Sequence, residues 1–260
     1  MREICSVRDV VRETPNTVTL RFEHPKAARP GQFVMVWIPG EDELPMSLSY
    51  VREGEPKGVT IKAMGETTRR LLSTRPGAPI GIRGPYGVPF DLSPRRILVV
   101  AGGSGAAILA PAAEYAQGSG AEVTVANGAT TARELLFPRR LQEAATGGYH
   151  EATDDGTQGR RGFVTDLAAD LLQAGRFDAL WTCGPEIMME KLYREALRRG
   201  VPFFASVERH MKCAIAMCDA CAFGPYHVCS DGPVFSGEQI ARVEDFGRFK
   251  RAPSGARVRP

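Results

Sequence analysis

The chain has 260 residues, a length typical of two domains with an appendage. Hydrophobic residues make up 43% of it and charged residues 24%, as in ordinary globular proteins. A net charge of +3 is too small to indicate nucleic acid as a partner. Because the sequence has neither an 18-residue apolar run nor the apolar core of a signal peptide at its start, we expect a cytoplasmic protein with no membrane contact.

The first part of the chain, up to about residue 92, consists of short apolar or alternating stretches separated by glycine and proline. Val18, Leu20 and Phe22 alternate with polar residues, as the buried side of a strand does. Several such stretches close together favour a small antiparallel β-barrel. The predicted strands are 17–22, 32–38, 47–51, 59–63 and 80–82, with one helix at 67–73.

The pattern changes after Ser93-Pro94, where buried strands begin to alternate with helices. This alternation predicts a parallel α/β sheet. The predicted strands are 96–101, 121–126, 149–153, 179–182 and 202–207. The predicted helices are 106–116, 131–144, 165–173 and 185–198.

Two turns of this α/β part are candidates for nucleotide binding. The first, rich in glycine, joins a buried strand to a helix, where backbone amides and the helix N-terminus favour a pyrophosphate. A tight turn without a ligand explains the same glycines. The second follows a later strand, at the edge where such sheets bind ligands, although Cys183 equally fits a buried structural cysteine. The candidate residues are Gly102, Gly103, Ser104, Gly105, Cys183, Gly184 and Pro185.

Four of the six cysteines lie close together, with the spacing C-x4-C-x2-C-x7-C. Disulfides rarely persist in the cytosol, so such a cluster indicates a metal centre. The spacing is that of plant-type 2Fe–2S clusters. A structural zinc site is the alternative, although zinc ribbons usually pair two C-x2-C knuckles and only one is present here. The candidate ligands are Cys213, Cys218, Cys221 and Cys229.

The order of barrel, α/β part and cysteine cluster resembles the ferredoxin–NADP reductase superfamily. Within it, the sequence is most similar to the electron-transfer subunits of dihydroorotate dehydrogenase, over about residues 5–240. The widely shared stretches are Gly31-Gln-Phe, Pro45-Met-Ser-Leu, Gly65-x-x-Thr68, Gly84-Pro-Tyr-Gly, Ala101-Gly-Gly-Ser-Gly, Asp154-Asp-Gly, Gly162-x-Val-Thr-Asp166 and Cys183-Gly-Pro. The specific stretch runs from Ser206-Val-Glu-Arg-His-Met-Lys-Cys213 to Cys229-Ser-Asp-Gly-Pro-Val-Phe235.

The resemblance implies a division of the chain into an FAD-binding β-barrel (1–92), an NAD-binding α/β domain (93–207), a 2Fe–2S segment (208–238) and a C-terminal tail (239–260). The basic end of that tail, from residue 248, is expected to be solvated and irregular. By the same resemblance the four clustered cysteines are the 2Fe–2S ligands and the two glycine turns bind NAD(H). Cys183 and Glu208 are candidates for positions near the nicotinamide and flavin. The implied FAD residues are Leu44, Pro45, Met46, Ser47, Thr60, Ile61, Lys62, Gly65, Thr67 and Thr68.

The implied function is electron transfer between NAD(H), FAD, a 2Fe–2S cluster and an FMN-containing catalytic subunit of dihydroorotate dehydrogenase, in pyrimidine biosynthesis. The expected assembly is a heterotetramer. The protein supplies orientation and tuning, while the cofactors carry the chemistry. One alternative is the flavin and iron–sulfur NAD(P)H reductase subunit of a sulfhydrogenase-like complex. Another is a zinc-stapled interaction protein on a degenerate reductase fold.

The sequence departs from the family pattern at a few positions. Leu44 stands where the family often has arginine, so one phosphate partner is missing, and Lys62 or Arg69 is a candidate substitute. Ala214 and Ala216 stand where the family often has glycine. If those positions require a positive φ, each alanine costs about 1 kcal/mol. The loop between the last two cysteines is also shorter than in many relatives.

Overall fold

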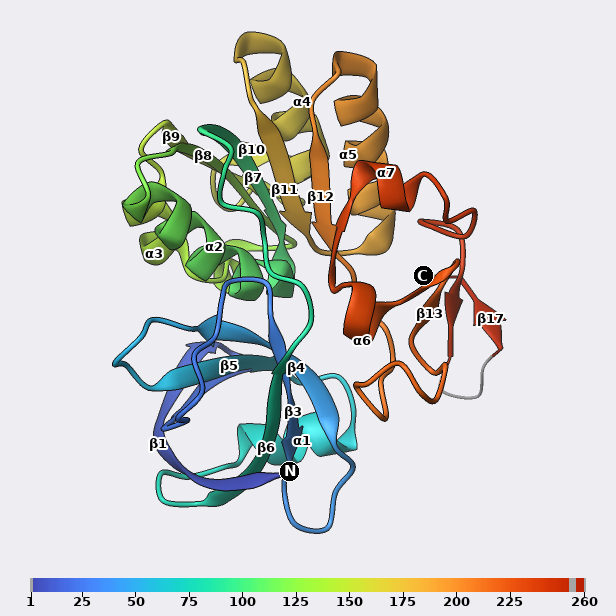
Figure 1. The fold of residues 1–260 in the computed structure, drawn as a ribbon. Coiled ribbons are helices and arrows are strands. Elements are labelled where there is room, and N and C mark those ends of the chain that lie inside the picture. Colours follow the sequence, from blue (N-terminus) through green and yellow to red (C-terminus); the bar gives the residue numbers. More distant parts are fainter. Residues whose placement is uncertain (1, 253–255, 260) are drawn as a thin grey trace.

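The N-terminal part of the chain closes into an antiparallel β-barrel, as expected (Figure 1). The structure is a computed structural model that describes residues 2–252 and 256–259. The apolar side of the alternating stretch, Val18, Leu20 and Phe22, is at most 1% exposed. In barrel order the strands are β1 (Glu3–Thr14), β2 (Thr17–Phe22), β5 (Lys57–Lys62), β4 (Leu44–Tyr50), β3 (Phe33–Trp37) and β6 (Pro79–Tyr86), with helix α1 (Glu66–Leu72) after β5.

Strand β1, with 12 residues, was not among the predicted strands. Its pairing with β2 slips between Val7 and Asp9 and again between Arg12 and Thr14. Each irregularity moves the following side chains to the other face, so the strand has no continuous two-residue period. The sequence pattern therefore does not predict a strand over these residues.

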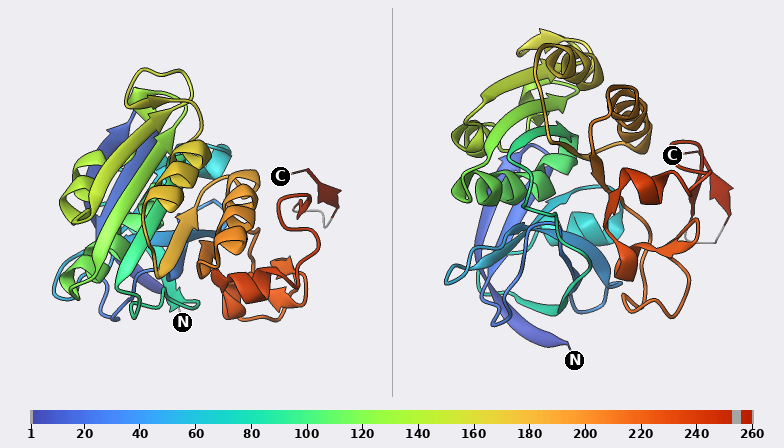
Figure 2. Two further views of the ribbon diagram at one scale, coloured as in Figure 1. Left: turned by 90° about the horizontal axis from the view of Figure 1, so that it is seen from above. Right: turned by 45° about the horizontal axis from the view of Figure 1, so that its top comes forward.

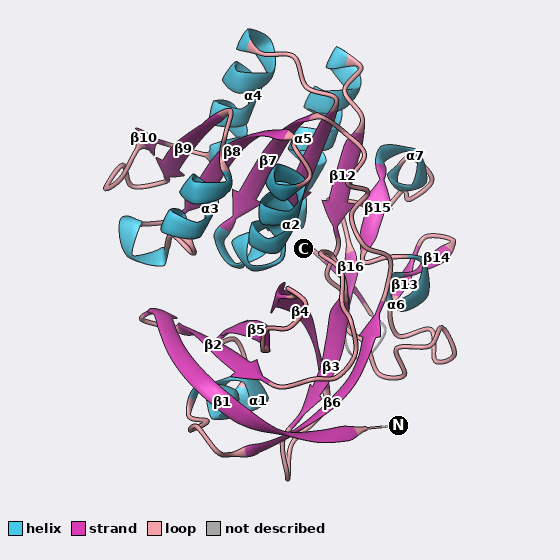
Figure 3. Cartoon of the chain, turned by 60° about the vertical axis from the view of Figure 1, so that its left-hand side comes forward, coloured by secondary structure: helices cyan, strands magenta, loops and turns pink. Residues whose placement is uncertain are grey.

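The α/β part is a sheet with helices on both faces, which confirms the predicted class (Figure 3). Ile97 and Val99 pack in one core with α2 and α3, while Leu98 and Val100 pack in another with α4 and α5. In sheet order the strands are β10 (Arg160–Arg161), β9 (Gly148–Thr153), β8 (Glu122–Ala129), β7 (Arg96–Gly102), β11 (Ala179–Cys183), β12 (Phe203–Ser206) and β15 (Val234–Ser236). The helices are α2 (Ala106–Gly118), α3 (Pro138–Ala144), α4 (Val164–Ala174) and α5 (Glu186–Arg199), with the short 3-10 turns η1 (Gly103–Gly105) and η2 (Ala132–Glu134).

The predicted helix over 131–144 is wrong in its first half. The chain makes the turn η2, continues without helix through Leu135 and Leu136, and begins α3 only at Pro138. Proline disfavours the helical conformation of the residue before it, and Phe137 instead has a φ of 54°. Both leucines are buried, so the apolar spacing that suggested a helix reflects packing of a loop.

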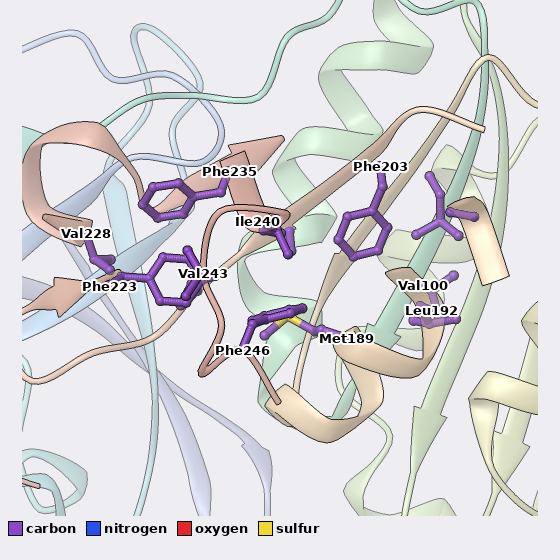
Figure 4. Close-up of a cluster of buried hydrophobic side chains, with 14 of the residues drawn as sticks. Val100, Met189, Leu192, Phe203, Phe223, Val228, Phe235, Ile240, Val243 and Phe246 are labelled. Carbon is purple, nitrogen blue, oxygen red and sulfur yellow. The ribbon is translucent and has the colours of Figure 1, made fainter. Parts of the chain in front are cut away.

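The C-terminal segment packs against both other parts of the molecule (Figure 2). Its strand β15 pairs antiparallel with β12, and its Gly232 carbonyl accepts from the amide of Val88, 2.6 Å away, in the chain that follows β6. Aromatic residues of the segment share one core with Met189 and Leu192 of α5 (Figure 4). Its other elements are β13 (Ala222–Phe223), β14 (Tyr226–His227), α6 (Val228–Asp231), α7 (Gly237–Ile240), β16 (Lys250–Arg251) and β17 (Arg257–Val258).

The first part of the tail, before its basic end begins at residue 248, is packed. Val243 and Phe246 are each 5% exposed and belong to the shared core. Beyond them β16 and β17 pair antiparallel, so the prediction is wrong for those strands, while 253–255 and 260 lie outside the described residues. Within the described part of the chain, no helix has the length and apolarity needed to cross a membrane.

The packing around Gly105 leaves no room for the side chain of alanine. A Cβ atom there would lie 2.0 Å from the carbonyl oxygen of Cys183, although the φ of −60° suits any residue. We expect Gly105→Ala to destabilise the protein by about 1–3 kcal/mol or more, as overpacking does. Gly118→Ala is the matched control: a Cβ at Gly118 meets nothing within 4 Å, and alanine in a helix should stabilise by about 0.5–1 kcal/mol. Urea unfolding of both variants measures the difference, and equal stabilities would contradict this account.

Candidate functional site

A cavity of about 630 Å³ opens where β7, β8, β9 and β11 end. Its wall includes the predicted nucleotide residues Gly102, Gly103, Ser104, Gly184 and Pro185. Lys62 reaches it from the barrel and Glu208 from the start of the C-terminal segment. The fold therefore brings residues of all three parts of the chain to one cavity.

The glycines of the first turn have different roles. Gly103 has a φ of 54°, and a Cβ there would meet nothing within 4 Å, so the backbone lies open to a ligand. Gly102 is packed against Met188, and Gly105 against the carbonyl of Cys183. The uncrowded backbone at Gly103 is the part that leaves room for a phosphate group, and the packed glycines bring the strand ends together.

Cys183 and Glu208 are neighbours in different environments. The Cys183 thiol is buried, and burial together with the charge of Glu208 raises its pKa. The thiol therefore remains protonated at neutral pH, with Ser206 as a hydrogen-bond partner. Glu208 is exposed and lines the cavity. This geometry makes Glu208 the group that can contact a ligand and Cys183 part of the packing beneath it.

The sequence analysis missed several residues that line the cavity. Gly128, one residue before the end of β8, pairs with Gly102 at the end of β7, and Asp154 directly follows β9. The rule that ligands bind beyond the carboxyl ends of parallel strands could have identified both. Glu186 and Lys191 reach the cavity from α5, which only the packing of that helix reveals.

The barrel has a partly open seam between β4 and β5. Their pairing covers Leu48 with Val59 and Tyr50 with Gly58, whereas the predicted FAD segment 44–47 pairs with β3 on its other side. Leu44, Pro45, Met46 and Ser47 are all half-buried. The seam therefore offers backbone groups and one half-covered strand face to a flat ligand.

Several predicted FAD side chains already have partners. The Thr60 hydroxyl donates to Ser49, and the Thr67 hydroxyl donates to Glu41 at 2.9 Å. The Thr68 hydroxyl accepts from the amide of Gly65 at 2.8 Å and so caps α1. These residues fit a phosphate through their backbone amides better than through their hydroxyls.

The two candidate substitutes for the missing arginine at Leu44 lie in different places. Lys62 lines the nucleotide cavity, with its Nζ 3.5 Å from Glu134 Oε1. Arg69 lines a second hollow of about 590 Å³ beside α1. Lys62 is therefore the candidate that shares a cavity with the glycine turns.

The loop that begins at Cys213 forms a nest of amides around sulfur. The amides of Ile215 and Met217 donate to Cys213 Sγ at 3.4 and 3.3 Å, and that of Ala216 donates to Cys229 Sγ at 3.2 Å. Such nests bind anions, and thiolates are the form of cysteine that binds metal. Burial raises the pKa of Cys213, but the donated hydrogen bonds outweigh it and lower that pKa to about 6.

The four clustered cysteines lie close enough for their thiols to affect one another. The Cys218 thiol is a hydrogen-bond partner of Cys213. Burial raises the pKa of Cys229, and the nearby Cys221 and Cys213 raise it further, to about 12. In the described ranges, no three His, Cys, Asp or Glu side chains are grouped as a single metal ion requires. A 2Fe–2S cluster takes two cysteines on each iron, whereas zinc takes four around one centre. The four cysteines, with backbone amides donating to two of their sulfurs, have the chemistry that thiolate ligands of an iron–sulfur cluster require.

The alanines that replace the family's glycines do adopt positive φ angles, 62° at Ala214 and 58° at Ala216. Because both positions have a positive φ, each alanine costs about 1 kcal/mol of local conformational energy, as expected from the sequence. These torsions are what turn the amides of 215–217 toward sulfur.

Comparison with known proteins also indicates an iron–sulfur protein. Residues 208–241 match the family model for the iron–sulfur cluster binding domain of dihydroorotate dehydrogenase B. A Methanocaldococcus jannaschii protein is 37% identical over 98% of this chain and 97% of its own length. A Methanothermobacter thermautotrophicus protein is 41% identical over 98% of this chain and 97% of its own length. Both are named as the electron transfer subunit of dihydroorotate dehydrogenase B (NAD(+)).

Solved structures share the fold. An NADH-dependent reduced ferredoxin-NADP oxidoreductase, described in connection with flavin-based electron bifurcation, has a TM-score of 0.82 at 29% identity, over 91% of this chain and 89% of that one. A ferredoxin NADP+ reductase from Neisseria gonorrhoeae has a TM-score of 0.62 at 16% identity, over 76% of this chain and 92% of that one, and shows the fold alone. With identities above 30% over nearly the whole length, the chain belongs to the family of dihydroorotate dehydrogenase B (NAD(+)) electron transfer subunits.

Proposed function

We propose that this chain carries electrons between NAD(H) and a separate catalytic subunit, with FAD and a 2Fe–2S cluster bound in between. The observation that carries the proposal is the shared cavity, which Lys62 of the barrel, Gly103 of the sheet and Glu208 of the cysteine segment all line. The cofactors supply hydride exchange and one-electron transfer when bound. The chain's own residues bind, orient and shield them.

Each part of the chain has a proposed share of this work. In the sheet, NAD(H) would be held by the uncrowded backbone at Gly103 and by the cavity wall of Gly102, Ser104, Gly184 and Pro185. In the barrel, the half-buried segment 44–47 and the start of α1 would hold FAD. The amide nest of Cys213 and Cys229 would stabilise the cluster thiolates, with Cys218 and Cys221 as the other ligands.

The proposed partner is the FMN-containing catalytic subunit of dihydroorotate dehydrogenase, in a heterotetramer. The relatives named above are electron transfer subunits of that enzyme. The described chain is already divided among three cofactor sites, so we place the dihydroorotate site on the other polypeptide. A cytoplasmic location is proposed with it, because cluster ligands must stay out of disulfides and the cytosol keeps cysteines reduced.

A second candidate is a reductase subunit of a sulfhydrogenase-like or related NAD(P)H complex. The TM-score of 0.82 with an NADH-dependent reduced ferredoxin-NADP oxidoreductase favours it, because that protein has the same fold in a different enzyme. The two candidates differ in the partner subunit and its substrate.

Reconstitution tests the division of labour. With NADH, the isolated chain should reduce an artificial acceptor such as ferricyanide but should not oxidise dihydroorotate. Adding the FMN subunit should give NAD-linked dihydroorotate oxidation. Turnover of dihydroorotate by the isolated, FMN-free chain would disprove the two-subunit proposal, and an inactive reconstituted pair would favour the second candidate.

Cys218→Ser should remove the cluster and leave the flavin. Cys218 is the exposed member of the four clustered cysteines, and the proposed FAD residues lie in the barrel. Cys5→Ser is the matched control, since Cys5 belongs to β1 of the barrel. Iron, labile sulfide and flavin are measured after anaerobic purification. Stoichiometric zinc without iron or sulfide in the unaltered protein would refute the cluster.

Thr68→Glu should weaken FAD binding without unfolding α1. A glutamate at this third helical position can still accept from the amide of Gly65, and its charge suits a helix N-terminus. Against a pyrophosphate the same charge should cost about 1–2 kcal/mol, which is roughly tenfold in affinity. Thr68→Gln keeps the cap without the charge. Equal flavin affinities of the two variants, measured by fluorescence titration, would move the pyrophosphate site elsewhere.

A further inference from the structure

Arg83 of β6 bridges two regions that are far apart in the sequence. Its Nε and Nη2 donate to the two carboxylate oxygens of Glu43 at 2.9 and 2.6 Å. Its Nη1 donates to the carbonyl oxygen of Cys213 at 3.2 Å, and Nη2 is 3.4 Å from that of Lys212. One guanidinium therefore joins the residue before the proposed FAD segment to the first cysteine of the cluster loop.

This contact is partly buried, unlike the exposed ion pairs of the barrel surface. The Arg83 and Glu43 side chains are 21% and 15% exposed, and the pair is bidentate. The Tyr86 ring lies 5.9 Å from the guanidinium and packs on Phe33 in the core shared with the cysteine segment. Bidentate, partly buried arginine pairs are stronger and more directional than exposed ones.

The contact also brings positive charge to the cluster loop. Arg2 approaches Glu43 at 3.4 Å, so two guanidinium groups face one carboxylate and leave a net charge of about +1. Lysine at position 83 would preserve this charge but could not bridge Glu43 and the Cys213 carbonyl in the same way. Charge and hydrogen bonding around cluster sulfurs are main determinants of cluster potentials.

We propose that Arg83 is a positioning residue for electron transfer, which ties the first cluster ligand to the strand of the proposed FAD site and raises the reduction potential of the cluster. This inference rests on the proposed function, because it takes Cys213 as a cluster ligand. Glu43 holds the guanidinium in place through two hydrogen bonds and partly neutralises its charge.

Four variants of the full chain, purified with its partner subunit, separate the two effects. Arg83→Gln removes charge and bridge, Arg83→Lys keeps only the charge, and Glu43→Gln removes the opposing carboxylate. Arg8→Gln is the control, since Arg8 pairs with Glu23 at the barrel surface. The readouts are the cluster midpoint potential by EPR-monitored titration, iron content, and hydrogen exchange of amides 213–218.

Arg83→Gln should lower the midpoint potential and speed amide exchange in the loop by roughly tenfold or more, as loss of charge-assisted hydrogen bonds implies. Arg83→Lys should keep most of the potential but show the faster exchange. Glu43→Gln should shift the potential upward, opposite in sign to Arg83→Gln.

Potentials and exchange rates of both Arg83 variants equal to those of Arg8→Gln would overturn the inference. If Arg83→Gln loses its iron, the lysine variant decides, since unchanged loop exchange in it would refute the bridge. Absence of iron and sulfide from the unaltered protein would instead refute the proposed function. The two failures are therefore distinguishable.

Discussion

The arrangement of the sites depends on a buried ion pair between Arg209 and Glu186. Arg209 Nη1 lies 2.6 Å from Glu186 Oε2 and Nη2 lies 3.1 Å from Oε1, with the side chains 4% and 7% exposed. A buried pair is stable only when further contacts satisfy its atoms. Here the Gly247 amide donates to Glu186, the Glu208 carbonyl accepts from Arg209, and the Phe223 ring lies 4.8 Å from the guanidinium. The pair thereby joins the first turn of α5, which lines the cavity, to the start of the cysteine segment.

This connection holds the cysteine segment against the rest of the molecule. With Arg209 held, Met211 is buried at 5% exposure and the chain reaches Cys213 beside the barrel, where Arg83 meets it. At the other end of the segment, the carbonyl of Pro233 accepts a hydrogen bond from the amide of Val207, and β15 extends the sheet. Electron transfer between separate cofactors requires constant separations, and these contacts give the cluster loop a constant place relative to the cavity and the seam.

The sequence predicts the features that rest on local patterns. The barrel, the parallel sheet and the cysteine spacing could be predicted because each is a periodicity or a fixed spacing. The same reasoning failed for β1, where irregular pairing breaks the period, and for residues 135–137, where Pro138 stops a helix that the apolar spacing suggested. Contacts such as that of Arg83 with Cys213, 130 positions apart, have no local pattern at all. Such contacts become visible only in the folded structure, where the three parts of the chain pack together.

The two alanines of the cluster loop show how a departure from a family pattern acquires a physical meaning. Both have left-handed torsions, but Ala214 is 3% exposed and its methyl group belongs to the shared core, whereas Ala216 is exposed. Burying a methyl group gains about 0.8 kcal/mol, which offsets much of the cost at position 214. At position 216 the compensation must come from elsewhere, and the amide that donates to Cys229 is the contact available. The loop conformation is therefore maintained by the sulfurs that it surrounds more than by the preferences of its own residues.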